Sequence, residues 1–307
     1  MRNKYVLVSE NINVIEEEFT LAEPNSMICK PLFIYLGFLE KKLFSNTYFP
    51  KKPVIPGSSG VAKVIEDPSG RRGDLSGKLV IVKPFSRHGL IGLERNGLLT
   101  HFASIPPENI WGFINQPKPF HAIIPYVSHA VNLVELGEDP SIVLGCNIIG
   151  IAVALVLKKT GREEPVIVCE NPPRSVKRLG LEIYESISAT SKSYSTVYVA
   201  DGDFPFIHDS LHELNYRNVI ISSYVMLKYL PLKREFEAKI ISTFDDKSSN
   251  YSLVSSISTT LMKALSYVEI NDISESILLL PPRDLGVIVN VKRVREDSSS
   301  GFSNKHI

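Results

Sequence analysis

Short apolar runs alternate with helix-like segments over residues 122–245, and this alternation is the feature that most constrains the fold. An apolar run at 141–145 is followed by a helix-like segment at 148–159, and a second continuous apolar run occupies 165–170. Continuous apolar runs of this length are typical of strands buried on both faces of a sheet. Strands that alternate with helices imply a parallel sheet with right-handed crossovers. The sequence therefore predicts an α/β unit built on a doubly wound parallel sheet.

The chain on either side of this unit has a different pattern of apolar residues. Short apolar segments recur between stretches rich in Pro and Gly, at residues 5–8, 26–33, 60–66, 77–84 and 98–105. Strands at this spacing are typical of a small β-barrel or sandwich. Toward the C-terminus, residues 250–268 place apolar side chains on one helical stripe, and residues 286–294 predict a closing strand. We also expect a helix over residues 172–184, which open on two prolines.

The charge balance excludes some partners. The 307 residues include 34 basic and 33 acidic side chains, so the net charge is +1. A chain this close to neutral has no overall field to hold a polyanion, so we expect no nucleic acid partner. We also expect no membrane partner, because the most apolar run, at 142–157, would span about 24 Å as a helix, less than the ~30 Å bilayer core.

The cysteine content points to a reducing compartment. The cysteines Cys29, Cys146 and Cys169 are too few, and odd in number, for the disulfide framework of a secreted domain. We expect Cys146 to serve only as a small apolar residue. The N-terminal residues turn acidic where the apolar region of a signal peptide would lie. The sequence therefore predicts a cytoplasmic protein.

The segment between the apolar run and the first helix predicts a phosphate-binding turn. Gly145, Asn147 and Gly150 lie where the glycines of G-x-G-x-x-G belong in a dinucleotide-binding unit. Gly145 allows the tight turn, and Gly150 allows close contact between helix and sheet. The helix that begins at Ile148 would direct its N-terminal N–H groups at a pyrophosphate. Glu170 ends the next strand, where a carboxylate would accept hydrogen bonds from an adenosine ribose.

Asn147 replaces the middle glycine of this motif. That glycine normally lets the backbone approach the pyrophosphate with no Cβ in the way. Asn tolerates left-handed dihedral angles, but its side chain would crowd the phosphate. Two alternatives follow: a dinucleotide binds here, or the parallel sheet persists with a closed or repurposed crevice.

Residues near this turn bear on the choice of cofactor. The carboxylate of Glu170 would repel the 2′-phosphate of NADP, whereas Arg174, Lys177 and Arg178 could attract it. We therefore expect NAD(H) or NADP(H), with a mild preference for NAD. Four more candidates end two predicted strands at the crevice edge, where ligands of parallel sheets bind: Asp201, Gly202, Ser222 and Ser223.

Several segments, taken in order, resemble the medium-chain dehydrogenase/reductase superfamily. They include residues 53–66, 96–110 and 143–161. The resemblance implies a GroES-like β-barrel domain formed by residues 1–121 and 246–307. It implies a Rossmann domain at residues 122–245, inserted between these two parts. It also implies a homodimer through edge-to-edge pairing of the Rossmann sheets, for which the predicted strand at 238–243 could supply the edge.

The chain departs from this family at the zinc ligands. Zinc-dependent members have Gly-His-Glu where this chain has Gly57, Ser58 and Ser59, and the other two ligand positions fall near Gly37 and Ile124. A catalytic zinc needs three protein ligands, so we expect no zinc. The Pro-Gly-Ser-Ser form is similar to the zinc-independent quinone oxidoreductase branch, where hydride passes directly between the nicotinamide and a carbonyl or alkene.

These observations lead to two hypotheses of different class. The first is a zinc-independent, NAD(P)(H)-dependent oxidoreductase that acts on a small carbonyl, enone or alcohol. For it, Glu40 and Ser58 are the candidates for a catalytic group. In the segment 37–41, where the resemblance implies polar groups, only Glu40 and Lys41 could serve. Asn147 and Ile148 would lie at the pyrophosphate. The second is a catalytically inactive relative that serves as an interaction module, which the missing zinc ligands and the replaced glycine favour.

Overall fold

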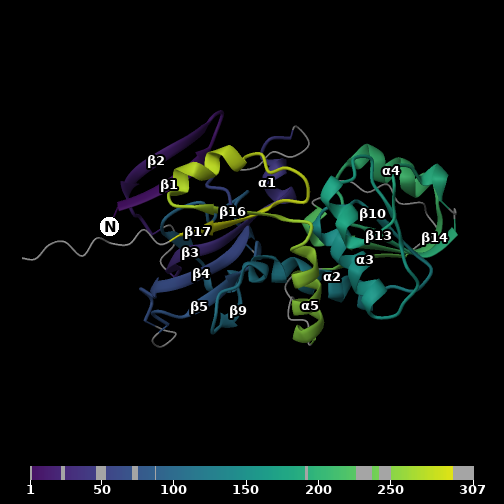
Figure 1. The fold of residues 1–307 in the computed structure, drawn as a ribbon, viewed down its shortest axis with the longest axis horizontal. Helices are drawn as coiled ribbons and strands as arrows, with labels where there is room; N and C mark the ends of the chain where they lie inside the picture. Colours follow the sequence, from purple (N-terminus) through teal and green to yellow (C-terminus); the bar gives the residue numbers. More distant parts are fainter. Residues whose placement is uncertain are drawn as a thin grey trace, which may run out of the picture.

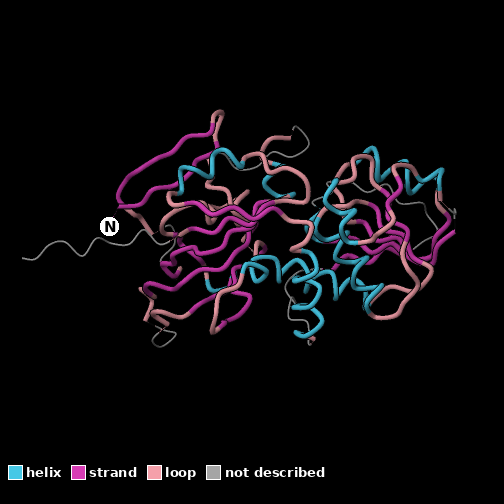
Figure 2. Tube along the Cα trace, in the orientation of Figure 1, coloured by secondary structure: helices cyan, strands magenta, loops and turns pink. Residues whose placement is uncertain are grey.

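The computed structural model describes residues 2–21, 25–45, 53–70, 75–86, 88–190, 193–225, 237–241 and 250–292. Two units lie side by side (Figure 1). One is rich in strands and combines both ends of the described chain, and the other alternates strands and helices (Figure 2). No helix within the described residues is long and apolar enough to cross a bilayer.

The second unit contains a parallel sheet of six strands in the order β12-β11-β10-β13-β14-β15. The strands are β10 (Ser141–Leu144), β11 (Val166–Val168), β12 (Ile183–Tyr184), β13 (Ser193–Val199), β14 (Asn215–Ser222) and β15 (Glu237–Ile241). Chain order starts at the centre with β10, runs outward to β12, then returns to the other side with β13. This arrangement confirms the doubly wound sheet, and it puts a topological switch point between β10 and β13, where ligands of such sheets bind.

Helices cover both faces of this sheet. α2 (Ile124–Glu135), α3 (Ile148–Lys159) and α5 (Tyr251–Leu261) pack against one another on one face. α4 (Phe204–Glu213) contributes Ile207 and Leu211 to the core on the opposite face. β10 serves both cores because its side chains alternate, with Val143 in one and Ile142 in the other.

The first unit contains a seven-stranded sheet that both chain ends build. Its order is β16-β17-β3-β4-β5-β9, and β8 also pairs with β3. The strands are β3 (Met27–Leu36), β4 (Ser59–Glu66), β5 (Leu79–Val82), β8 (Ala103–Ile105), β9 (Ile110–Ile114), β16 (Ser266–Ile270) and β17 (Val287–Val291). The pairing of β17 with β3, antiparallel from Val287↔Leu36 to Asn290↔Phe33, joins segments that are far apart in sequence.

Shorter elements complete this unit. The hairpin of β1 (Arg2–Val8) and β2 (Ile12–Glu18) lies at its outer side (Figure 1), and β6 (Phe85–Ser86) pairs with β7 (Gly89–Leu90). The short helix α1 (Phe38–Lys42) follows β3, and 3-10 turns occur at Pro107–Asn109, Pro119–Ile123, Ile187–Ala189 and Ser223–Val225.

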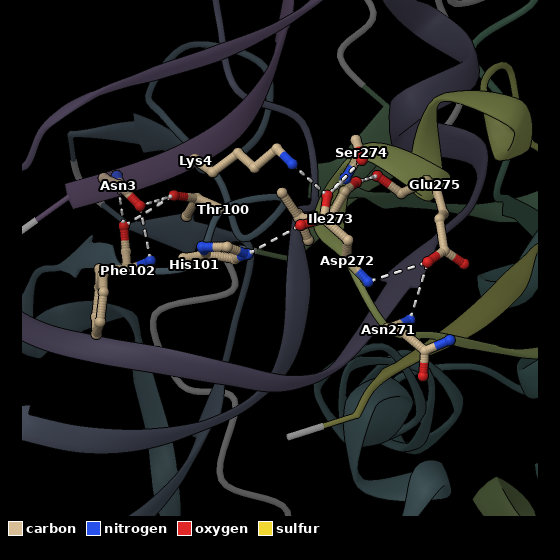
Figure 3. Close-up of polar contacts among 11 residues, drawn as sticks. Asn3, Lys4, Thr100, His101, Phe102, Asn271, Asp272, Ile273, Ser274 and Glu275 are labelled. Atoms are coloured by element: carbon tan, nitrogen blue, oxygen red, sulfur yellow. Dashed lines mark hydrogen bonds and ion pairs between the residues drawn. The ribbon is translucent and has the colours of Figure 1, made fainter. Parts of the chain in front are cut away.

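Polar contacts attach β1 to the turn that follows β16 (Figure 3). Lys4 Nζ lies 2.8 Å from Asp272 Oδ1. Asp272 also caps the 3-10 helix Ile273–Leu279 by accepting from the Ser274 N–H at 2.9 Å, as its position before that segment suggests. Partial burial alone would raise the pKa of Asp272, but the hydrogen bonds from Lys4 and Ser274 outweigh it and hold the pKa at about 2. These contacts join two segments of the first unit that are far apart in the sequence.

Two predicted helices were wrong in extent. Residues 172–184 form only the 3-10 helix Arg174–Leu179, which Gly180 ends in a left-handed conformation before β12 begins. The apolar stripe over residues 250–268 continues past the end of α5 at Leu261, and its last residues belong to β16. In both places pairing with a neighbouring strand overrides the local helical pattern.

Candidate functional site

The turn between β10 and α3 has room for glycine alone at two positions. Gly145 has a φ of +104°, and a Cβ on it would lie 2.5 Å from Asp201 Cβ. A Cβ on Gly150 would lie 2.0 Å from the carbonyl oxygen of Gly145. Both glycines therefore serve the close packing of helix, turn and neighbouring strand end that the motif requires.

Asn147 is the N-cap of α3. Its Oδ1 accepts hydrogen bonds from the N–H groups of Ile149 at 2.9 Å and Gly150 at 3.3 Å. Its Nδ2 donates to the carbonyl of Ala200. The side chain thus occupies two of the donors that a pyrophosphate would use at a helix N-terminus. Asn147 has an extended conformation with a φ of −74°, so the left-handed tolerance of Asn is not what the turn uses.

The first unit contributes two lysines to the space in front of this turn. Lys41 and Lys42 end α1, and Lys41 Nζ donates to the carbonyl of Asp284. Burial lowers the pKa of Lys41, which Asp284 and Asp201 partly offset. Burial also lowers the pKa of Lys42, which Asp201 partly offsets. Gly202 leaves room for the second lysine, since a Cβ there would lie 2.9 Å from Lys42 Nζ.

These groups surround a cavity of about 260 Å³ at the carboxyl edge of the parallel sheet. The polar residues that line it include Lys41, Lys42, Asn147, Glu170, Asp201 and Asp284. A second cavity of about 570 Å³ continues from Glu170 to Arg174 and Lys177. The two cavities share Glu170, so together they form a crevice that runs from the lysines past the end of β11.

A disulfide between Cys146 and Cys169 lines the first cavity. It joins the turn after β10 to the residue before Glu170, with the two Cα atoms 5.9 Å apart. The expectation that Cys146 is only a small apolar filler was wrong. The sparse cysteine set did not predict this bond, because partners 23 residues apart meet only once β10 and β11 pair.

The candidate Glu40 belongs to α1 and the candidate Ser58 directly precedes β4, and both are fully buried. Glu40 accepts from the N–H groups of Gly37 at 2.6 Å and Ser58 at 2.8 Å. Burial raises the pKa of Glu40, and these hydrogen bonds only partly counter it. Ser58 Oγ lies 3.0 Å from the hydroxyl of Tyr126. Neither Glu40 nor Ser58 is among the described residues that line the cavity, so their catalytic role stays a prediction.

Ser222 and Ser223 lie away from the described cavity as well. Ser222 is buried, and its Oγ lies 2.9 Å from His129 Nε2. No local pattern predicts this pair, because His129 lies on α2 and Ser222 is 93 residues further along the chain. Asp201 does line the cavity, and its Oδ1 accepts from the N–H groups of Gly202 at 2.6 Å and Asp203 at 3.3 Å.

We expect the free energy of unfolding to fall at acid pH because His129 is buried. Burial lowers the pKa of His129 to about 3, below the ordinary value of 6.5. A lowered pKa stabilises the fold above pH 6.5, and this stability is lost as the pH falls toward 3. At pH 5 the loss should be about 2 kcal/mol relative to pH 7. His129→Gln, whose amide can keep a hydrogen bond to Ser222, should remove this part of the acid loss in urea unfolding at pH 7 and pH 5.

The control is His88→Gln, since the side chain of His88 is 53% exposed. This variant should lose stability between pH 7 and pH 5 as the wild type does. An undiminished acid loss in His129→Gln would contradict the assignment of that loss to His129.

The described residues do not offer a zinc site. Within the described part of the chain, no three His, Cys, Asp or Glu side chains lie close enough together to hold a metal ion. At the position of the family's histidine ligand, Ser58 instead joins Glu40 and Tyr126 in the buried hydrogen-bonded group. This donor set does not suit zinc, which prefers nitrogen and sulfur ligands in tetrahedral geometry.

The similarity of this chain to known proteins is one of fold. No protein-family model matches the sequence, and no curated protein matches it. Among solved structures, one similar chain is a putative zinc-binding dehydrogenase from Sinorhizobium meliloti bound to NADP, with a TM-score of 0.70 and 16% identity, covering 94% of this chain and 99% of that one.

Two other solved structures are similar over the same extent. A 2R,3R-butanediol dehydrogenase from Bacillus subtilis has a TM-score of 0.67 and 14% identity, covering 94% of this chain and 100% of that one. A short chain alcohol dehydrogenase from E. coli, complexed with NADH, has a TM-score of 0.67 and 15% identity, covering 94% of this chain and 99% of that one. At such low identity the likeness is one of fold, and this chain therefore has the medium-chain dehydrogenase/reductase fold, a GroES-like unit joined to a Rossmann unit.

Proposed function

We propose that this chain is a zinc-independent, NAD(P)(H)-dependent oxidoreductase that acts on a small carbonyl, enone or alcohol. The observation that carries the proposal is the crevice at the carboxyl edge of β10 and β11, where the N-terminus of α3, Glu170 and two lysines of the other unit meet. A crevice at the switch point of a doubly wound sheet is where dinucleotides bind. The similar folds with NADP and NADH bound are consistent with this use.

In this proposal Lys41 and Lys42 supply contacts to the diphosphate that the N-terminus of α3 no longer offers. Asn147 already occupies two N–H groups of α3, so a pyrophosphate needs other partners. Lys41 and Lys42 offer positive charge in a partly buried place, now balanced by Asp201 and Asp284. A bound diphosphate would compete with these carboxylates for the ammonium groups, because charge-assisted hydrogen bonds from lysine to phosphate are strong.

The other residues of the crevice would orient the cofactor. Glu170 lies at the point where the two cavities meet, and we assign it to the adenosine ribose. The same carboxylate gives a mild preference for NAD, which Arg174 and Lys177 in the second cavity weaken. When bound, the nicotinamide would supply hydride chemistry, while the chain positions the cofactor and excludes water.

The test is a titration with NADH and NADPH, followed by nicotinamide fluorescence. We expect saturable binding of at least one of them, and turnover with a member of a panel of small carbonyls, enones and alcohols. Absence of binding for both up to millimolar concentration would contradict the proposal. The edge strand β15 further leads us to propose a homodimer, which a monomer mass in light scattering would contradict.

A second candidate is an interaction module without turnover. The specific observation that favours it is the capping of α3 by Asn147, which satisfies N–H groups that a nucleotide would otherwise bind. Four carboxylates line the first cavity beside the two lysines, and they also disfavour an anion: Glu170, Asp201, Asp203 and Asp284. The same titration separates the two candidates, because a module would bind neither nucleotide.

Asn147→Gly should bind the nucleotide more tightly than the wild type, by about tenfold. Glycine removes the side chain that occupies the Ile149 and Gly150 N–H groups and frees them for phosphate, whereas glycine at an N-cap costs only a few tenths of a kcal/mol of stability. The measurement is the Kd for NADH and NADPH by fluorescence.

Asn250→Gly is the matched control, because Asn250 caps α5 by accepting from the Leu253 N–H at 3.0 Å, away from the crevice. Its nucleotide affinity should equal that of the wild type. A weaker affinity of Asn147→Gly would contradict the crowding account and make the Asn147 amide a ligand of the nucleotide.

A further inference from the structure

We propose that the Cys146–Cys169 disulfide is a redox-modification site that tunes the nucleotide affinity of the crevice, with a dithiol as its reaction partner. This inference rests on the proposed function. Both cysteines line the cavity that also contains Lys41 and Lys42, and they are 5% and 4% exposed, so the crevice is the route by which a small thiol would approach the bond. The third cysteine, Cys29, is fully buried in the other unit, and its thiol is free.

The bond joins the two halves of the proposed nucleotide site. Cys146 belongs to the turn between Gly145 and Asn147, which would face the phosphates. Cys169 directly precedes Glu170, which would face the ribose. The last register pair of β10 and β11 is Leu144↔Val168, so both cysteines lie just past the paired region. There the disulfide takes over from the sheet in holding the two segments together.

The position of the disulfide couples its redox state to the binding of the dinucleotide. A dinucleotide that extends from Asn147 to Glu170 contacts both cross-linked segments. With the bond intact, the segments are held at one separation, with Cα atoms 5.9 Å apart. After reduction, the turn and the Glu170 segment can move independently, and binding must then order them, which costs affinity. The oxidised chain should therefore bind the nucleotide more tightly. By linkage, the bound nucleotide protects the bond from reduction by the same factor.

The reduction step is a two-electron thiol–disulfide exchange. A thiolate of the dithiol attacks Cys169 Sγ, the bond between the two cysteines breaks, and its electron pair leaves on Cys146 Sγ. The positive N-terminus of α3 and the neighbouring lysines stabilise negative charge on Cys146, which makes it the better leaving group. The second thiolate of the reductant then attacks the mixed disulfide. It releases the Cys169 thiolate, which takes up a proton, and the reductant departs as a cyclic disulfide.

The experiment measures Kd for NADH and NADPH on the full chain, once after air oxidation and once in dithiothreitol. We expect the reduced wild type to bind about tenfold more weakly. In a redox titration, saturating nucleotide should then lower the reduction potential of the disulfide by about 30 mV, so that the bond is harder to reduce. Cys29→Ala is the matched control and should keep both effects, whereas Cys146→Ser should bind nucleotide with the same Kd with and without dithiothreitol.

The outcomes separate this inference from the proposed function. Nucleotide binding with equal Kd in the oxidised and reduced wild type would overturn the redox inference and leave the proposed function intact. Absence of binding in both forms would overturn both. The wild type needs no substitution for this comparison, so poor folding of Cys146→Ser does not affect it. Peptide mapping under non-reducing conditions that finds no link between Cys146 and Cys169 would also overturn the inference.

Discussion

The double variant Lys41→Met/Lys42→Met should bind NADH and NADPH about 100-fold more weakly than the wild type, a loss of about 2.7 kcal/mol. Hydrogen bonds to charged groups contribute about 1.5–3 kcal/mol each, and both lysines are only partly buried, so solvent screens part of that energy. Methionine keeps much of the length of lysine, so the apolar packing of α1 should persist. The measurement is Kd by nicotinamide fluorescence at low and at physiological salt.

A matched control is Lys78→Met, because Lys78 is exposed and lies outside the crevice. Its affinity should equal that of the wild type. The weakening caused by the double variant should also shrink at high salt, since salt screens charges that are open to solvent. An unchanged Kd for the double variant would contradict the assignment of the diphosphate to these lysines.

Gly150→Ala should destabilise the fold by about 3 kcal/mol or more, the upper range for an added methyl group in a packed interior. The added Cβ would lie 2.0 Å from the Gly145 carbonyl oxygen, which belongs to the backbone and has no side-chain freedom to yield. Helix α3 would have to move away from the turn, and the crevice would lose its shape. Urea unfolding measures the change in free energy, and the same samples show whether nucleotide binding is lost.

Gly112→Ala provides the comparison. Gly112 lies in β9, and a Cβ there meets no atom within 4 Å. This variant should unfold within about 0.5 kcal/mol of the wild type. Equal stability of Gly150→Ala and Gly112→Ala would contradict the close contact between α3 and the turn.

Local patterns were sufficient to predict the parallel sheet and the succession of strand, turn and helix at residues 141–159. The apolar runs that became β10 and β11 and the segment that became α3 appear in the sequence with nearly their observed bounds. Such patterns succeed because strands buried on both faces and a helix start leave a signature within about ten residues. The helix expected over residues 172–184 failed because strand pairing of Ile183 and Tyr184, which no local pattern shows, decided the outcome.

The details of the crevice could not be predicted in the same way. Lys41 and Lys42 reach it from the other unit, and the disulfide needs β10 and β11 to be paired first. The role of Asn147 was open for a different reason. The sequence predicted only that its side chain would crowd the phosphate, and the geometry of its amide shows that it caps the N–H groups of α3.

The most direct test of the central claim is a crystal structure of the chain with NADH or NADPH bound. We expect the diphosphate within hydrogen-bond distance of Lys41 or Lys42, in front of the α3 N-terminus, and the adenosine ribose against Glu170. Well-ordered crystals soaked at saturating nucleotide that show the crevice free of it, or show it bound elsewhere on the chain, would contradict the account.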